Sequence, residues 1–207
     1  MIEIVFVRHG QTKYNVQGVL QGHLNAPLNE KGLADAKALG LILRDFSFDK
    51  LFTSDLNRAK DCAKVISEAT GKIFVEDSLL RERNFGVHQE KSVVSLGYKD
   101  HTYPELVKHL YNCNCPGGEN NEGLLRRVEV FLEMCLRDYD GKRVLVVGHG
   151  GFIMLALNYI LNEPYIYENG RKHSNLSGSF VKLNSDREVI DSLINVSAGE
   201  IVGYLSK

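Results

Sequence analysis

Two histidines in this sequence each follow an apolar, β-branched run at the point where the run ends. His9 comes directly after Arg8 and the run Ile2–Val7, and His149 comes just after the run Val144–Val147. Glycines stand beside both histidines, and glycine lets a backbone approach a ligand closely and offer its N–H groups to an anion. In open α/β sheets, ligands bind at the carboxyl ends of the strands. If the two runs are neighbouring strands, both imidazoles would aim into one crevice.

Either histidine alone is weak evidence, because a histidine beyond a strand is more often a hydrogen-bonded loop residue. The pair is stronger evidence, since both sites end a buried strand with polar groups and one of them carries an arginine as well. The other histidines show no HExxH or comparable spacing typical of a metal site; they are His23, His88, His101, His109 and His173. We therefore expect no metal and no cofactor.

The elements that would position these residues follow from the hydrophobic pattern. Continuous apolar runs indicate buried strands, and we expect strands at Ile2–Val7, Leu51–Thr53, Ile73–Val75, Val144–Val147, Ser179–Leu183 and Val189–Ile194. Helical spacing indicates helices between these strands. The first helix would be capped by Asn29 and would bury Leu33, Ala36, Leu39, Leu43 and Phe46.

Three further helices are expected. One would be capped by Ser54 or Asp55 and stop near Gly71; the others would span 122–138 and 152–161.

Strands that alternate with helices predict an α/β fold, with a mostly parallel central sheet covered by helices on both faces. No repeat or linker divides the sequence, so we expect one domain over 1–207. The stretch 87–115 has irregular patterning and is expected to form a lid over the site.

Composition narrows the class of protein. The 207 residues are 43% hydrophobic, which is ordinary for a folded domain. Lysine and arginine number 25, aspartate and glutamate 26, so no basic excess indicates binding to nucleic acid or to a membrane. The four cysteines include no second pair at zinc-site spacing and are typical of thiols in a reducing cytoplasm. The apolar run at the start is too short for a signal peptide or a membrane span.

Beyond the two histidines, a series of motifs resembles the histidine phosphatase superfamily, also called phosphoglycerate-mutase-like. The family's RHGxTxxN motif stands complete at 8–15, Leu20-Gln21-Gly22 follows, and Ser54-Asp55-Leu56-Asn57-Arg58-Ala59 matches SxLxRA. Leu80 to Gly86 is similar to LxExxxG, and Pro116-Gly117-Gly118-Glu119 precedes the glycine turn around His149. The motifs run in family order over about three quarters of the chain.

The resemblance implies a role for each matching residue. A phosphoryl group in transfer carries charge on three equatorial oxygens, which Arg8, Arg58 and His149 would hold. His9 would attack phosphorus as a neutral imidazole and form a phosphohistidine. Glu82 would protonate the leaving alkoxide and later activate water. We expect catalytic roles for these five residues and contacts with substrate from Asn15, Gln21, Gly22 and Gly150.

The family contains phosphatases and mutases, and several features favour a phosphatase that acts on a small phosphorylated metabolite. No long insertion of the mutase kind separates Glu82 from His149, Gln21 stands where mutases usually have serine, and Tyr14 and His23 stand where they usually carry tryptophan. A cofactor-dependent phosphoglycerate mutase remains the alternative. A second alternative is a non-catalytic member that binds a phospho-ligand or a protein, although all five catalytic candidates are present. The sequence leaves monomer and homodimer open.

Overall fold

The computed structural model describes residues 1–97, 115–163 and 173–206. In chain order its elements are β1 (Ile2–Arg8), α1 (Lys13–Gln17), α2 (Glu30–Leu43), β2 (Lys50–Thr53), α3 (Asn57–Thr70), β3 (Phe74–Glu76), the 3-10 turns η1 (Ser78–Leu80), η2 (Gly86–His88) and η3 (Val94–Leu96), α5 (Asn121–Asp138), β4 (Arg143–Gly148), α6 (Gly150–Ile160), β5 (Ser177–Leu183), β6 (Val189–Ser197) and α7 (Ala198–Leu205). The six expected strands and the four long expected helices are all present.

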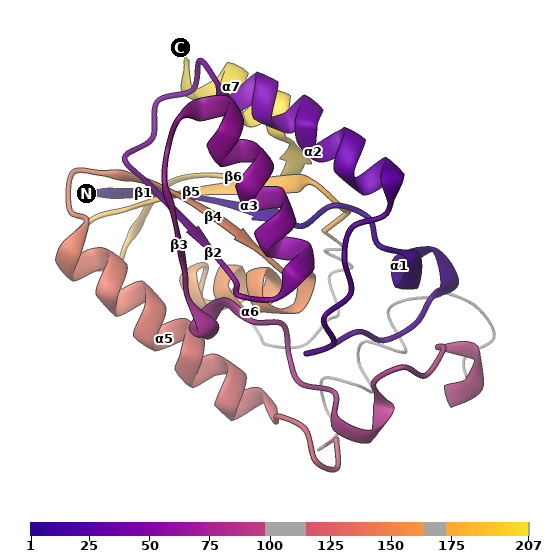
Figure 1. Ribbon diagram of the computed structural model, residues 1–207. Helices are drawn as coiled ribbons and strands as arrows, with labels where there is room; N and C mark the ends of the chain where they lie inside the picture. The colour runs from indigo at the N-terminus through magenta and orange to yellow at the C-terminus, as the bar shows by residue number, and fades with distance from the viewer. Residues whose placement is uncertain (98–114, 164–172, 207) are drawn as a thin grey trace.

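These strands form one sheet in the order β3-β2-β4-β1-β5-β6. Neighbours from β3 to β1 are parallel, and β5 and β6 continue the sheet as an antiparallel pair. Figure 1 shows α2, α3 and α7 on one side of the sheet, with α5 and α6 on the other. The predicted α/β class, with a mostly parallel sheet and helices on both faces, is confirmed.

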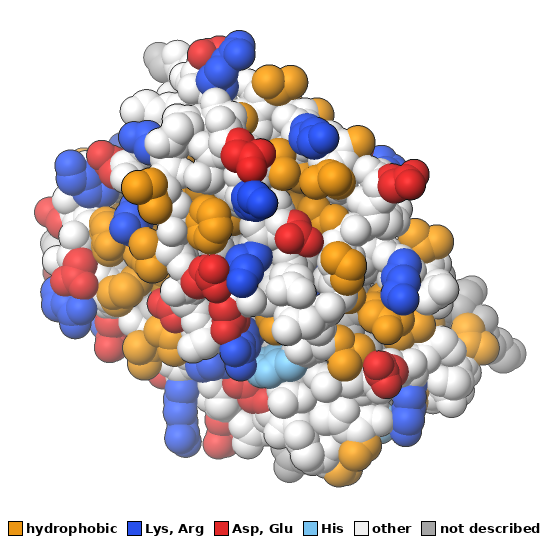
Figure 2. All heavy atoms as spheres, in the orientation of Figure 1, with side chains coloured by type: hydrophobic (Ala, Val, Ile, Leu, Met, Phe, Trp, Pro, Cys, Tyr) orange, Lys and Arg blue, Asp and Glu red, His pale blue; other side chains and the backbone are white. Residues whose placement is uncertain are grey.

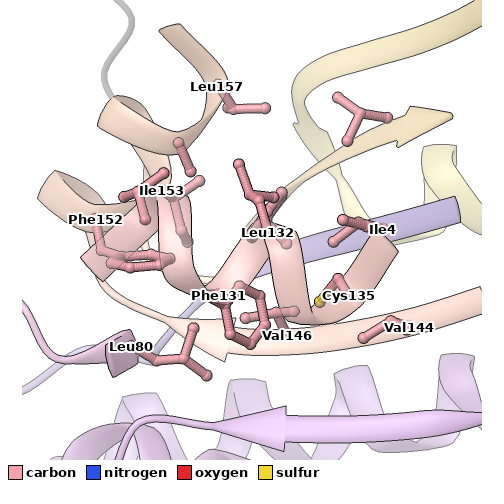
Figure 3. Packing of buried hydrophobic residues seen from close by; sticks show 14 of the residues in the cluster. Ile4, Leu80, Phe131, Leu132, Cys135, Val144, Val146, Phe152, Ile153 and Leu157 are labelled. Carbon is pink, nitrogen blue, oxygen red and sulfur yellow. The ribbon is translucent and has the colours of Figure 1, made fainter. Parts of the chain in front are cut away.

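Burial on both faces explains why β1 and β4 read as continuous apolar runs. In β1, Ile4 and Phe6 belong to the core beneath α5 and α6, whereas Val5 and Val7 belong to the core beneath α2, α3 and α7. Figure 3 shows the first of these cores, where Phe131 of α5 lies beside Val146 of β4, and the ring of Phe152 from α6 packs edge-on against that of Phe131. Because both faces are covered, β1 is apolar from Ile4 to Val7; Glu3 near its start is only partly buried, and polar residues return at Arg8, where the strand ends.

Several local predictions are confirmed and others are wrong. Asn29 caps α2 by accepting from Gly32 N–H at 2.7 Å, and Gly71 ends α3 in the left-handed conformation (φ +69°) that glycine adopts without strain. The cap of α3 is Leu56 rather than Ser54 or Asp55, and Leu56 has no side-chain acceptor. The Ser54 hydroxyl accepts from Leu56 N–H instead, which shapes the turn before the helix.

A further difference concerns which residues of α2 face inward. Leu33 was expected inside but is 39% exposed, because the buried stripe of α2 runs through Gly32, Ala36 and Leu39 instead. Gly32 lies against the backbone of the loop after β1, so close that a Cβ would stand 2.1 Å from the Gln11 carbonyl oxygen. The helix therefore approaches this loop through a glycine, which the apolar pattern could not indicate.

The surface that Figure 2 shows carries acidic and basic side chains interspersed, without a large area of one sign. None of the described helices is long and apolar enough to cross a membrane. The lid predicted at 87–115 lies mostly outside the described residues, which stop at 97 and resume at 115. It stays a prediction, as does the single domain over 1–207.

Candidate active site

Parallel pairing of β1 with β4 brings His9 and His149 together. Arg8 stands opposite Gly148 in the register, and His9 N–H donates to the Gly148 carbonyl at 2.9 Å. The two strands therefore end side by side, and each delivers its histidine at the same edge of the sheet. The imidazole centroids are 5.2 Å apart with their planes tilted by 58°, and both side chains are buried.

The contacts of His9 define one neutral tautomer. Its Nδ1 lies 2.7 Å from the Gly10 carbonyl oxygen, which can only accept, so Nδ1 carries the hydrogen. Its Nε2 accepts from Arg58 Nε–H at 3.2 Å, so Nε2 holds a lone pair. The Gly10 peptide is fixed in turn, because its N–H donates to the Cys62 sulfur at 3.1 Å. Nε2 is therefore the nucleophilic atom of this side chain.

Burial keeps both imidazoles neutral. It lowers the pKa of His9 well below its usual range, and the positive charges of Arg58 and Arg8 lower that pKa further. The pKa of His149 is lowered well below its usual range by the same causes, first burial and then Arg58. His9 is thus ready to attack at neutral pH, whereas His149, expected as part of a cationic cradle, is neutral in the free protein.

Arg58 is held by backbone carbonyls. Its Nη1 donates to Leu24 at 2.8 Å and its Nη2 to Gly22 at 2.7 Å. Burial lowers the pKa of Arg58 to about 10, which still leaves the guanidinium charged at neutral pH. Gly22 adopts φ +49°, and a Cβ there would stand 2.2 Å from Gln89 Oε1. Gly22 offers its carbonyl to Arg58 from a position that only glycine fits, and its expected contact with substrate stays a prediction.

Arg8 and His149 have buried nitrogens without a partner. The Nη1 of Arg8 donates to the His173 carbonyl at 2.5 Å, but Arg8 Nε and both ring nitrogens of His149 find no hydrogen bond among the described residues. Gly150 lies beside this arginine, where a Cβ would make ordinary contact with Arg8 Nε at 3.4 Å, and its expected contact with substrate stays a prediction. Buried polar atoms are nearly always hydrogen-bonded, so these three nitrogens mark a place for a ligand.

Glu82 joins the same site through the first turn of α6. Its Oε2 accepts from Gly151 N–H at 3.1 Å and its Oε1 from Arg83 N–H at 2.9 Å. Its charge also acts on Arg58, whose pKa it raises against the effect of burial. The N–H groups of Gly10 and Gly151, which were expected to face an anion, thus donate to Cys62 and Glu82 instead.

The side chains of Asn15 and Gln21 both contact Thr12 rather than the two histidines. Asn15 Oδ1 accepts from Thr12 N–H and lies 3.0 Å from the Thr12 hydroxyl, as part of a capping box on α1. Gln21 Oε1 also lies 3.0 Å from that hydroxyl. Both side-chain carbonyls face this loop, which makes their amide nitrogens the groups able to reach a substrate. Their substrate contacts stay predictions.

One supporting residue had no role assigned from the sequence. Asn175 Nδ2 donates to the His9 carbonyl at 2.9 Å, and Leu176 N–H donates to the Arg8 carbonyl at 3.0 Å. The segment before β5 therefore holds the backbone of both residues. An Asn beside an apolar strand was the available signal, but such a residue is more often only a turn former.

The site and the fold agree with comparisons to known proteins. Residues 4–196 match the model of the histidine phosphatase superfamily, branch 1. The chain belongs to this family. Among the described residues, no group of three or more His, Cys, Asp or Glu side chains is placed to hold a metal ion.

Individual relatives differ in their named activities. The chain is 31% identical to the "Probable phosphoglycerate mutase GpmB" of Salmonella choleraesuis over 97% of this chain and 94% of the relative. It is similar to a mycobacterial glucosyl-3-phosphoglycerate phosphatase in complex with VO3, with 27% identity, a TM-score of 0.80 and coverage of 94% and 97%. The alpha-ribazole phosphatase of Shigella flexneri has the same fold, with a TM-score of 0.79, 24% identity and coverage of 93% and 96%.

Proposed function

We propose that this protein is a metal-independent phosphomonoesterase, which acts on a small phosphorylated metabolite through a phosphohistidine on His9. The observation that carries the proposal is a buried neutral imidazole beside two arginines, Arg8 and Arg58, and beside nitrogens that have no partner among the described residues. A phosphoryl group supplies the oxygen acceptors that Arg8 Nε–H and one N–H of His149 need. A sugar phosphate, a phospho-acid or a ribazole-type ester would each present such a group.

In the first step, His9 Nε2 forms a bond to phosphorus while the bond from phosphorus to the ester oxygen breaks. The Arg58 hydrogen bond to Nε2 passes to a phosphoryl oxygen as the substrate enters, which frees the lone pair. Arg8, Arg58 and His149 hold the three equatorial oxygens, where the charge of the transition state lies. Glu82, which carries a proton in the complex with substrate, gives it to the leaving oxygen.

The second step returns the site to its starting state. The Glu82 carboxylate takes a proton from water, the water oxygen bonds to phosphorus, and the bond to His9 breaks. Inorganic phosphate leaves, His9 is again neutral, and Glu82 again carries its proton. Gly151 N–H supports this exchange because it holds one carboxylate oxygen at the first turn of α6.

The mutase is the second candidate, since the relative with 31% identity carries that name. A mutase must return the phosphoryl group to a sugar acid and keep water away from the intermediate. Support for the phosphatase comes from the sequence, which has no long insertion between Glu82 and His149, and from similarity to the glucosyl-3-phosphoglycerate phosphatase.

We also propose the cytoplasm as its compartment, since Cys62 and Cys135 are buried thiols and not disulfides.

Phosphate release tests the proposal. The protein in EDTA should hydrolyse p-nitrophenyl phosphate, and His9→Ala should abolish both turnover and the acid-labile phosphoenzyme. A folded protein without turnover between about pH 5 and 8 would instead favour a binding protein. With 3-phosphoglycerate and a trace of the 2,3-bisphosphate, rapid formation of 2-phosphoglycerate without free phosphate would establish the mutase. A panel of phosphorylated metabolites would then identify the substrate class.

A further inference from the structure

Arg127 on α5 binds the backbone of the segment that ends at Glu82. Its Nη1 donates to the Leu79 carbonyl at 2.5 Å and to the Arg81 carbonyl at 2.9 Å, and its Nη2 lies 3.4 Å from the Glu82 carbonyl. A guanidinium carries its donors in one planar, rigid fork. A single group on a helix therefore spans the last four residues of this segment.

Glu119 holds that guanidinium from the other side. Arg127 Nε donates to Glu119 Oε1 at 2.8 Å and Nη2 to Oε2 at 2.7 Å, and each side chain is only 18% exposed. The Glu119 backbone is fixed as well, because its N–H donates to the Asn84 carbonyl and its carbonyl accepts from Arg83 Nε–H at 2.9 Å. Glu119 thus joins Arg83 and Asn84, the two residues that follow Glu82, to Arg127.

Packing of α5 does not explain this pair. The helix is buried through a separate apolar stripe, made of Leu124, Val128, Phe131, Leu132 and Cys135. A largely buried ion pair is a poor source of stability compared with apolar residues of similar size, but it can fix one geometry. Here the fixed geometry is that of Glu82, whose carboxylate must also meet Gly151 N–H on α6 at 3.1 Å.

We propose that Arg127, oriented by Glu119, is a positioning residue for the proton donor Glu82. The inference rests on the proposed function and deepens it. Arg127 fixes the main chain that leads to Glu82, the His23 ring adds a contact of 2.8 Å between Nε2 and the Glu82 carbonyl oxygen, and Gly151 fixes the carboxylate. Together they hold the carboxyl at the leaving oxygen. Displacement of a catalytic group by about 1 Å can reduce a rate by as much as 10²-fold. Loss of Arg127 should therefore slow proton donation while the phosphoryl cradle stays intact.

Two aryl phosphates of nearly the same shape separate these effects. Phenyl phosphate has a basic leaving group that needs a proton, whereas p-nitrophenyl phosphate scarcely needs one. Arg127→Ala and Glu119→Gln should lower kcat for phenyl phosphate by about 10-fold or more and for p-nitrophenyl phosphate by less than about 3-fold. Arg127→Lys, which keeps the charge without the fork, should give a smaller loss with the same preference.

Matched controls come from the same helix. Arg137 donates to Asp138 at the exposed end of α5, and Glu122 is exposed in its first turn. Arg137→Ala and Glu122→Gln should leave kcat unchanged for both substrates. Circular dichroism checks folding, and if Arg127→Ala does not fold, the comparison is made with Arg127→Lys and Glu119→Gln.

A double-mutant cycle with Glu82→Gln makes the test specific. In the Glu82→Gln background, Arg127→Ala or Arg127→Lys should lower phenyl phosphate turnover by less than about 3-fold further, because the group that it positions is already lost. Additive losses, or equal losses on the two substrates, would overturn the inference and leave the proposed function standing. A wild-type protein that hydrolyses neither substrate would overturn the proposed function, and this inference with it.

Discussion

Binding of a dianion should draw a proton onto His149. In the free protein burial holds its pKa well below the usual range, so the ring is neutral. Both ring nitrogens are without a partner among the described residues, so the ring can accept a second hydrogen and present it to an anion. His9 cannot do so as easily, because its Nε2 faces the Arg58 Nε–H donor and its Nδ1–H already faces the Gly10 carbonyl.

The size of the effect follows from Coulomb's law. At an effective permittivity of about 20, one unit charge about 4 Å from the imidazolium stabilises it by about 4 kcal/mol. That energy shifts the protonation equilibrium of His149 roughly 1,000-fold for each negative charge on the anion. Sulfate stays a dianion across neutral pH, so any proton that binds with it must come to the protein. We expect uptake of close to one proton per sulfate at pH 7.

Isothermal titration calorimetry measures this uptake from the dependence of the binding enthalpy on the ionisation enthalpy of the buffer. Wild-type protein should show the uptake, and His149→Gln should show almost none. His23→Gln is the control, because His23 is a partly buried histidine near the site whose charge, like that of His9, lowers the pKa of His149. Sulfate binding without uptake, or uptake that survives in His149→Gln and disappears in His23→Gln, would refute the reasoning.

Two further predictions concern the hydrogen bond that holds Gly10 next to His9 and the loss of stability at low pH that follows from burying His9 and His149. Burial raises the pKa of both Cys62 and Cys135 to about 12, but only Cys62 accepts from Gly10 N–H. Cys62→Ala leaves that amide unsatisfied, at a cost of about 1–3 kcal/mol in stability, and should lower kcat on p-nitrophenyl phosphate because Gly10, which orients His9, is no longer held. Cys135→Ala should leave kcat unchanged, and equal kcat in the two variants would contradict this. The urea midpoint should fall as pH drops from 7 to 5, because the unfolded chain protonates His9 and His149 below about pH 6.5 while their folded-state pKa values are lower, at up to about 1.4 kcal/mol per pH unit for each histidine. A midpoint that rose in this range would contradict the assignment.

The part of the fold that carries the nucleophile could be predicted because its signals are local. A strand covered on both faces is mostly apolar, so β1 and β4 stood out although Glu3 and Arg143 lie near their starts, and a histidine directly follows the end of each strand. His9 and His149 then had to lie close together if β1 and β4 were neighbouring strands, and the pairing of Arg8 with Gly148 confirms that they are.

Contacts made by side chains across elements could not be predicted from such patterns. Glu119 lies before the start of α5 and Arg127 lies eight residues later within the helix, and nothing local indicates that they hold the Glu82 segment. The short helix α7 was also missed, although a signal was present. Ser197 and Glu200 form a capping box that begins it, and Ser-x-x-Glu is the sequence signature of such a start.

The chemistry of its partners separates an arginine that can act on a ligand from one that holds the protein together. Arg81 binds Asp55 and Arg127 binds Glu119, so a carboxylate already neutralises each of them. Arg8 and Arg58 are instead oriented by backbone carbonyls, which are neutral dipoles, and among the described residues neither forms an ion pair, although the charge of Glu82 acts on Arg58 from a distance.

This arrangement is electrostatically unfavourable in the free protein, because the positive charges repel one another. Arg8 and Arg58 each lower the pKa of His9, and Arg8 lowers the pKa of Arg58. A chain with a net charge of −1 can thus present a concentrated positive charge at one edge of its sheet. Groups fixed before the reaction need no reorganisation when charge develops on the phosphoryl oxygens, which is how a preorganised site lowers a barrier. The unfavourable proximity of like charges in the free protein is relieved only when a dianion binds, so the same feature that strains the empty site favours the transition state of phosphoryl transfer.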